Sequence, residues 1–107
     1  MAGMTEDSGT ASVDGAFDAE GNAVLRIAGE IDLASTAAVE ARVTNLCRGA
    51  SKVVVDLSDV TFMDSSGLAM LLRTRDSVGD VAIVAASRTV ARVVQAAGLS
   101  EVLHLDA

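Results

Sequence analysis

Three neighbouring residues, Asp64, Ser65 and Ser66, have the types and spacing that could do chemistry in this 107-residue chain. A serine hydroxyl acts as a nucleophile only when a base lies beside it and removes its proton. The single histidine, His104, lies near the C-terminus in a segment of alternating apolar residues, and no G-x-S-x-G elbow surrounds either serine. We therefore expect these serines to cap a helix or to accept a modification rather than to hydrolyse a substrate.

Other kinds of catalytic or cofactor site have less support. One cysteine and one histidine cannot complete a structural zinc site. Gly67 stands alone, so the chain has no glycine-rich phosphate loop, and Asp56 and Asp59 are explained by solvation at a strand end. We predict that the protein is not an enzyme and has no catalytic residue, metal or cofactor of its own.

The charge of the chain restricts its partners. Eight basic and fifteen acidic residues give a formal net charge of −7, which argues against nucleic acids and anionic membranes as partners. No apolar run approaches the length of a membrane span, and the acidic N-terminus does not resemble a secretory signal. A single cysteine, Cys47, at helical spacing from Val39 and Val43, fits a buried thiol in a reducing compartment. We predict a soluble, cytoplasmic protein.

A buried strand and an amphipathic helix position the two serines. Val53–Leu57 is a short apolar run with three consecutive valines, which is typical of a buried strand. After Gly67 the apolar residues recur at helical spacing, at Leu68, Leu71 and Leu72. Asp64 or Ser65 is the natural N-cap of this helix. Both serine hydroxyls therefore lie at a helix N-terminus, where added negative charge is well tolerated.

The rest of the chain alternates between strands and helices. We expect a small, polar, disordered tail over residues 1–11 and one domain over residues 12–107. The elements expected in the domain besides the central pair are strands at Ala11–Phe17, Ala23–Ala28, Val81–Ala86 and Val102–Leu105, and helices within Leu33–Arg48 and between Ser87 and Gly98. This order predicts an α/β fold: a mixed, mostly parallel sheet of four to five strands with three or more helices, opened by a β-hairpin.

Two motifs carry a resemblance to a known family. Gly29-Glu30-Ile31-Asp32 is followed by the strand Val53–Leu57 and then by Phe62-Met63-Asp64-Ser65-Ser66-Gly67-Leu68. This pattern resembles the STAS-domain anti-sigma factor antagonists of bacteria, and the resemblance covers about residues 12–106. The resemblance implies the same fold class, a STAS-like α/β domain.

The resemblance also implies a function. In the family, the serine after the aspartate is phosphorylated by the partner, an anti-sigma factor with serine kinase activity, and this serine corresponds to Ser65. Unphosphorylated, the protein would bind the anti-sigma factor and release a sigma factor. ATP and Mg²⁺ would belong to the kinase, and a serine phosphatase is a further candidate partner. The expected partner-binding residues are Asp32, Asp64, Ser65, Ser66, Gly67 and Met70.

Three alternatives stay open at this point. Ser65 is also explained as a helix cap without regulation. Met70, which lies off the leucine stripe, is equally well explained as core filling. Some STAS domains are non-phosphorylated scaffolds, such as subunits of a transporter ATPase or of a stress-signalling assembly. The chain also has Ala69 where family members often have glycine, which bears on which partner it recognises.

Overall fold

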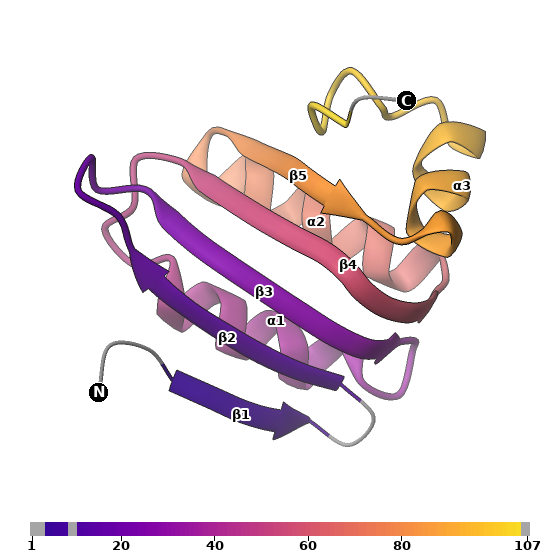
Figure 1. Ribbon diagram of the computed structural model, residues 1–107, viewed down its shortest axis with the longest axis horizontal. Coiled ribbons are helices and arrows are strands. Elements are labelled where there is room, and N and C mark those ends of the chain that lie inside the picture. The colour runs from indigo at the N-terminus through magenta and orange to yellow at the C-terminus, as the bar shows by residue number, and fades with distance from the viewer. Residues whose placement is uncertain (1–3, 9–10, 106–107) are drawn as a thin grey trace.

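The computed structural model describes residues 4–8 and 11–105, which form a five-stranded sheet with three helices (Figure 1). The strands are β1 (Met4–Ser8), β2 (Ala11–Phe17), β3 (Ala23–Ile31), β4 (Val53–Met63) and β5 (Val81–Ala86). The helices are α1 (Thr36–Leu46), α2 (Ser65–Val78) and α3 (Arg88–Ala96).

The strands lie in the sheet in the order in which they occur in the chain. The pairs β1–β2 and β2–β3 are antiparallel, and the pairs β3–β4 and β4–β5 are parallel. The helix α1 connects β3 to β4, and α2 connects β4 to β5. The predicted mixed α/β fold with an opening hairpin is confirmed. We expected mostly parallel strand pairs, but with β1 in the sheet two pairs are antiparallel and two are parallel.

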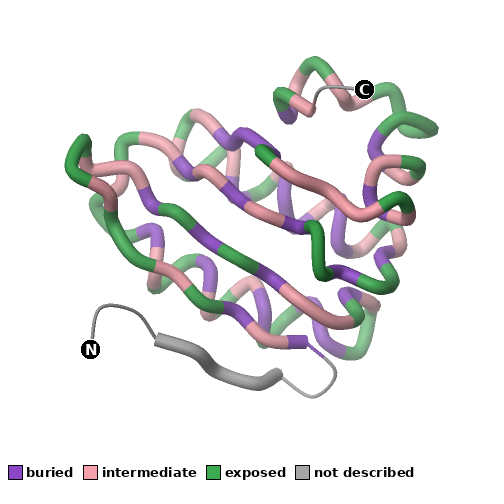
Figure 2. Tube along the Cα trace, in the orientation of Figure 1, coloured by how far each residue is buried: buried purple, intermediate pink, exposed green. Residues whose placement is uncertain are grey.

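The core lies between the sheet and the helices α1 and α2, which cover one of its faces (Figure 1). Buried and exposed residues alternate along β3, as expected for a strand with one covered face (Figure 2). The core is almost entirely aliphatic, and Cys47 is buried in it as predicted. Its largest fully buried side chains are those of Leu25, Ile27, Ile31, Leu57, Met70 and Leu103.

The N-terminal segment differs from the predicted disordered tail. Met4–Ser8 forms β1 and pairs with β2, with Met4 opposite Gly15 and Ser8 opposite Ala11. Backbone groups on the outer edge of β2 are thereby paired, an interaction that leaves no periodic pattern in the sequence. Residues 1–3 and 9–10 of the predicted tail lie outside the described residues, as do residues 106–107 of the predicted domain.

The C-terminal prediction is wrong. We expected a strand over Val102–Leu105, but Val102–His104 lie in turns and Leu105 has no regular structure. The Leu103 N–H donates to the carbonyl of Leu99, and His104 has a positive φ of 53°, neither of which fits a strand. The apolar alternation instead reflects the burial of Leu103, whose carbonyl accepts the Ile83 N–H at 2.9 Å and so pairs part of the outer edge of β5.

The first turn of α2 packs directly on the ends of β3 and β4. A Cβ atom at Gly67 would lie 2.7 Å from Met63 Cγ and 2.9 Å from Ile31 Cγ2. Both distances are shorter than van der Waals contact, and the Ile31 methyl group is held by a stiff β-branched side chain. Gly67 therefore fixes how closely the serine-bearing end of α2 approaches the sheet.

We predict that Gly67→Ala destabilises the protein by about 1–3 kcal/mol, since the added methyl group overpacks this contact. Urea unfolding measures the change. The exposed Ser77→Ala substitution on the same helix is the control and should stay within about 0.5 kcal/mol of the wild type. If the two variants were equally stable, the close approach at Gly67 would not constrain the helix.

Candidate functional site

The parallel pairing of β3 with β4 brings two loops to one edge of the sheet. Ile31 lies opposite Met63 in the register, so Asp32 and Asp64 each follow directly after one of these paired residues. The Asp64 N–H donates to the Ile31 carbonyl at 3.3 Å, and this hydrogen bond links the start of the second loop to the end of β3. Segments that are far apart in sequence thus form one surface at the carboxyl ends of β3 and β4.

Asp64 is the N-cap of α2, as predicted. Its Oδ1 accepts the Ser66 N–H at 2.9 Å and also the Ser66 hydroxyl. The Ser66 hydroxyl, and then the N–H groups of Ser66, Gly67 and Leu33, hold the pKa of the Asp64 carboxyl below its ordinary value, and partial desolvation opposes them. Asp64 therefore stays ionised and keeps the start of α2 capped.

The two serines differ in their surroundings. Ser66 is partly buried, and its Oγ lies 2.9 Å from Thr36 Oγ1 at the start of α1. Ser65 is exposed, and its hydroxyl makes no hydrogen bond to any residue in the described part of the chain. Ser65 is thus the hydroxyl that a second protein can reach.

A chain of polar contacts joins the two loops. Thr36 Oγ1 lies within hydrogen-bond distance of the Asp32 carbonyl oxygen and of Ser66 Oγ, and Ser66 Oγ in turn contacts Asp64 Oδ1, so the two hydroxyl protons are shared among three contacts. The side chain of Asp32 accepts the Ser35 N–H at 3.0 Å. Because the Thr36 and Ser66 hydroxyls are partly buried, they fix the loop that holds Asp32 relative to the loop that holds Ser65.

Two residues predicted to touch a partner are buried. Met70 is 0% exposed, so its prediction as a contact is wrong, and the alternative of core filling holds. Gly67 is buried as well and acts through packing rather than as surface. The buried face of α2 is wider than its leucine stripe because the helix packs against β4, β5 and α1 at once.

An exposed apolar residue beside Ser65 was not predicted from the sequence. Leu33 is 81% exposed and lines a hollow of about 460 Å³ between α1 and α2. The hollow is lined by Leu33, Thr36, Ala37, Glu40, Ser65, Ser66, Ala69 and Arg73. In the sequence, the signal for Leu33 is that this apolar residue lies next to Asp32 and does not continue the apolar face of α1.

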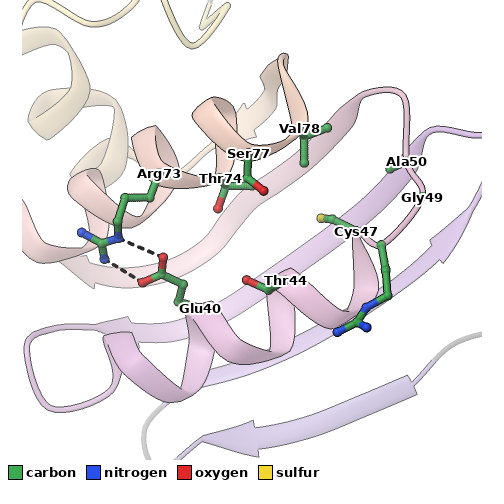
Figure 3. A pocket seen from close by; sticks show the side chains of 10 residues that line it. Glu40, Thr44, Cys47, Gly49, Ala50, Arg73, Thr74, Ser77 and Val78 are labelled. Atoms are coloured by element: carbon green, nitrogen blue, oxygen red, sulfur yellow. Dashed lines mark hydrogen bonds and ion pairs between the residues drawn. The ribbon is translucent and has the colours of Figure 1, made fainter.

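An ion pair bridges α1 and α2 at the far end of this hollow. Arg73 Nε and Nη2 donate to the two carboxylate oxygens of Glu40 at 2.9 Å and 2.7 Å (Figure 3). Glu40 and Arg73 also line a second hollow of about 510 Å³, which continues between the helices toward Cys47. Among the described residues, Arg73 is the only cation that lines the Ser65 hollow, and it is already paired with Glu40.

His104 does not reach the serines. Its Nε2 lies 3.0 Å from Asp80 Oδ1, and the Asp80 carbonyl accepts the N–H of Val53, the first residue of β4. The imidazole is thus at the opposite end of β4 from Ser65. Among the described residues, no helix is long and apolar enough to cross a membrane.

Comparisons with known proteins agree with this geometry. A family model described as the STAS domain matches residues 17–107. A curated relative, the anti-sigma-F factor antagonist RsfB of Mycobacterium tuberculosis, is 35% identical over 92 residues, which are 82% of this chain and 75% of the relative.

Solved structures share the fold. An anti-sigma factor antagonist from Mycobacterium paratuberculosis superposes with a TM-score of 0.72 at 26% identity, over 94% of this chain and 80% of that one. The anti-sigma factor antagonist SpoIIAA in its unphosphorylated form has a TM-score of 0.67 at 21% identity, over 94% of this chain and 84% of that one.

We predict that Thr36→Val destabilises the protein by about 1–2 kcal/mol, because the substitution keeps the volume but removes the hydroxyl that joins the loops. Urea unfolding measures the effect. Thr44→Val changes an exposed threonine of the same helix and should stay within about 0.5 kcal/mol of the wild type. Equal losses in both variants would mean that the Thr36 contact adds nothing.

The lowered pKa of Asp64 predicts a pH dependence of stability. A carboxyl with a lower pKa in the folded chain stabilises it above its unfolded pKa of about 3.9, and this stabilisation disappears as the pH falls through the folded pKa. We expect Asp64→Asn to be less stable than the wild type at neutral pH and to approach it in acid. Urea midpoints between about pH 7 and pH 2.5 measure this. A constant difference over that range would rule out ionised Asp64 as the stabilising cap.

Proposed function

Since the chain belongs to the STAS domain family, we propose that it is an anti-sigma factor antagonist controlled by phosphorylation of Ser65. It binds an anti-sigma factor that is also a serine kinase, and this binding releases a sigma factor. The observation that carries the proposal is the exposed Ser65 hydroxyl at the start of α2, beside a serine whose hydroxyl is already engaged. The name of the 35% identical relative describes a regulator of the same kind.

The surroundings of the two serines support Ser65 as the phosphoacceptor. A kinase must bring the terminal phosphate of ATP in line with the attacking hydroxyl, which requires an approach that other groups do not block. The Ser65 side chain is exposed, whereas the Ser66 hydroxyl contacts Thr36 and Asp64. Modifying Ser66 would break the contacts that join the two loops.

The switch follows from charge rather than from refolding. A phosphate on Ser65 adds a charge of about −1.5 to −2. The N-terminus of α2 favours added negative charge, so the isolated domain tolerates it. In a complex the same phosphate would be removed from water, and an unpaired buried charge costs several kcal/mol. A loss of about 4 kcal/mol weakens binding roughly a thousandfold.

The surface that docks on the anti-sigma factor includes Asp32, Asp64, Ser65 and the exposed part of Ser66. All four lie at the carboxyl ends of β3 and β4. ATP and Mg²⁺ are bound by the kinase, and a serine phosphatase resets Ser65. The cytoplasm, where sigma factors meet RNA polymerase, is the compartment in which this exchange takes place.

We predict that only one of the two serines accepts phosphate. Incubation with the purified kinase-type anti-sigma factor and ATP should add one phosphate to the wild type and to Ser66→Ala, and none to Ser65→Ala. Intact mass spectrometry measures this. Ser66→Ala is the matched control, since it removes the neighbouring hydroxyl and leaves Ser65 in place.

Binding of the same anti-sigma factor to immobilised wild type and Ser65→Asp gives the second readout. The aspartate carries fewer charges than a phosphate, so it should weaken capture only in part. Phosphate on Ser65→Ala would overturn the assignment of the site. Equal capture of a transporter ATPase or another assembly by both baits, with no phosphorylation, would favour the scaffold function.

A further inference from the structure

Two large apolar side chains are exposed near Ser65, at the end of the sheet where β3 and β4 terminate. Leu33 is 81% exposed in the loop after β3, and Phe62 is 45% exposed at the end of β4, opposite Glu30. Phe62 is one of only two aromatic residues in the chain. Exposed leucine and phenylalanine side chains at one end of a sheet are typical of a surface that a second protein covers.

The backbone holds Leu33 in place although its side chain is exposed. The neighbouring Asp32 is fixed by Ser35 and Thr36: its side chain accepts the Ser35 N–H, and its carbonyl oxygen contacts the Thr36 hydroxyl. A residue whose backbone is already ordered loses less freedom when a partner binds. The hollow of about 460 Å³ beside it, with Ala37 and Ala69 on its walls, leaves room for an apolar side chain from the partner.

The charges around the hollow indicate which kind of surface fits. Neither Asp32 nor Asp64 has an ion-pair partner among residues 4–8 and 11–105. A partner with basic side chains around an apolar centre would complement these carboxylates. A second copy of this chain is disfavoured, because each copy carries a net charge of −7.

We propose that Leu33 and Phe62 are the apolar anchors with which this protein binds its anti-sigma factor. An apolar side chain of the anti-sigma factor fills the hollow between α1 and α2 against Leu33, and its cationic side chains face Asp32 and Asp64. This inference rests on the proposed function and names the chemistry of the partner surface. The inference also explains why the phosphorylation site is at Ser65. Ser65 lines the same hollow, so the apolar side chain inserted by the partner would desolvate a phosphate on Ser65.

The test measures binding of the purified kinase-type anti-sigma factors of the source genome, one at a time and without ATP, by calorimetry. Leu33→Ser and Phe62→Ser should each raise the Kd at least about tenfold, because each removes a large apolar contact. Both side chains are exposed, so thermal unfolding should change little. Asp32→Asn should weaken binding mainly at low salt, as expected for a charge at the rim.

Matched controls come from the same chain. Phe17 is 49% exposed at the end of β2 opposite Ala23, which is the other end of β3, and Val84 is 61% exposed on β5. Phe17→Ser and Val84→Ser should leave the Kd within about twofold of the wild type.

Each outcome decides between the two levels of the proposal. If the wild type bound no anti-sigma factor, the proposed function would fail. If it bound one and Leu33→Ser bound equally well, the function would stand and the anchors would be wrong. A wild-type dimer in sedimentation that Leu33→Ser converts to a monomer would assign the surface to a second copy and overturn the inference.

Discussion

The parallel pairing of β3 with β4 is the constraint on which the rest of the site depends. Because Ile31 lies opposite Met63, the residues that follow each strand emerge side by side. The absence of a side chain at Gly67 then lets α2 begin directly against both strand ends. With these two contacts in place, the helix N-terminus, the two carboxylates and the two serines have little freedom left. The Thr36–Ser66 contact, between residues 30 positions apart, completes the arrangement.

The features that could be predicted from the sequence are those that short stretches of the chain determine. The cap at Asp64 and the buried strand that starts at Val53 follow from local residue types, and the structure has both. The burial of Met70 depends on several elements that pack on α2 together, and the turns at Val102–His104 form where the chain covers the edge of β5. Neither leaves a periodic pattern. The Thr36–Ser66 contact likewise exists only once two distant loops meet.

The different roles of two adjacent serines follow from helix geometry. Successive residues on a helix point about 100° apart, so Ser66 faces α1 while Ser65 faces solvent. The aspartate beside the two serines, Asp64, is a helix cap, and its charge is satisfied by the hydroxyl and N–H groups of the helix start. A regulatory phosphate at this point changes the charge of the surface and leaves the hydrogen bonds that hold the loops together intact.

The cover on β5 has a consequence for how this protein behaves at high concentration. The sequence of β5, VAIVAA, is uncharged and apolar, and such an edge strand at high concentration tends to pair with copies of itself. The hydrogen bond from Ile83 to Leu103 occupies part of that edge, and the net charge of −7 keeps copies apart. The C-terminal turns thus limit the pairing of this edge with the same edge of another copy.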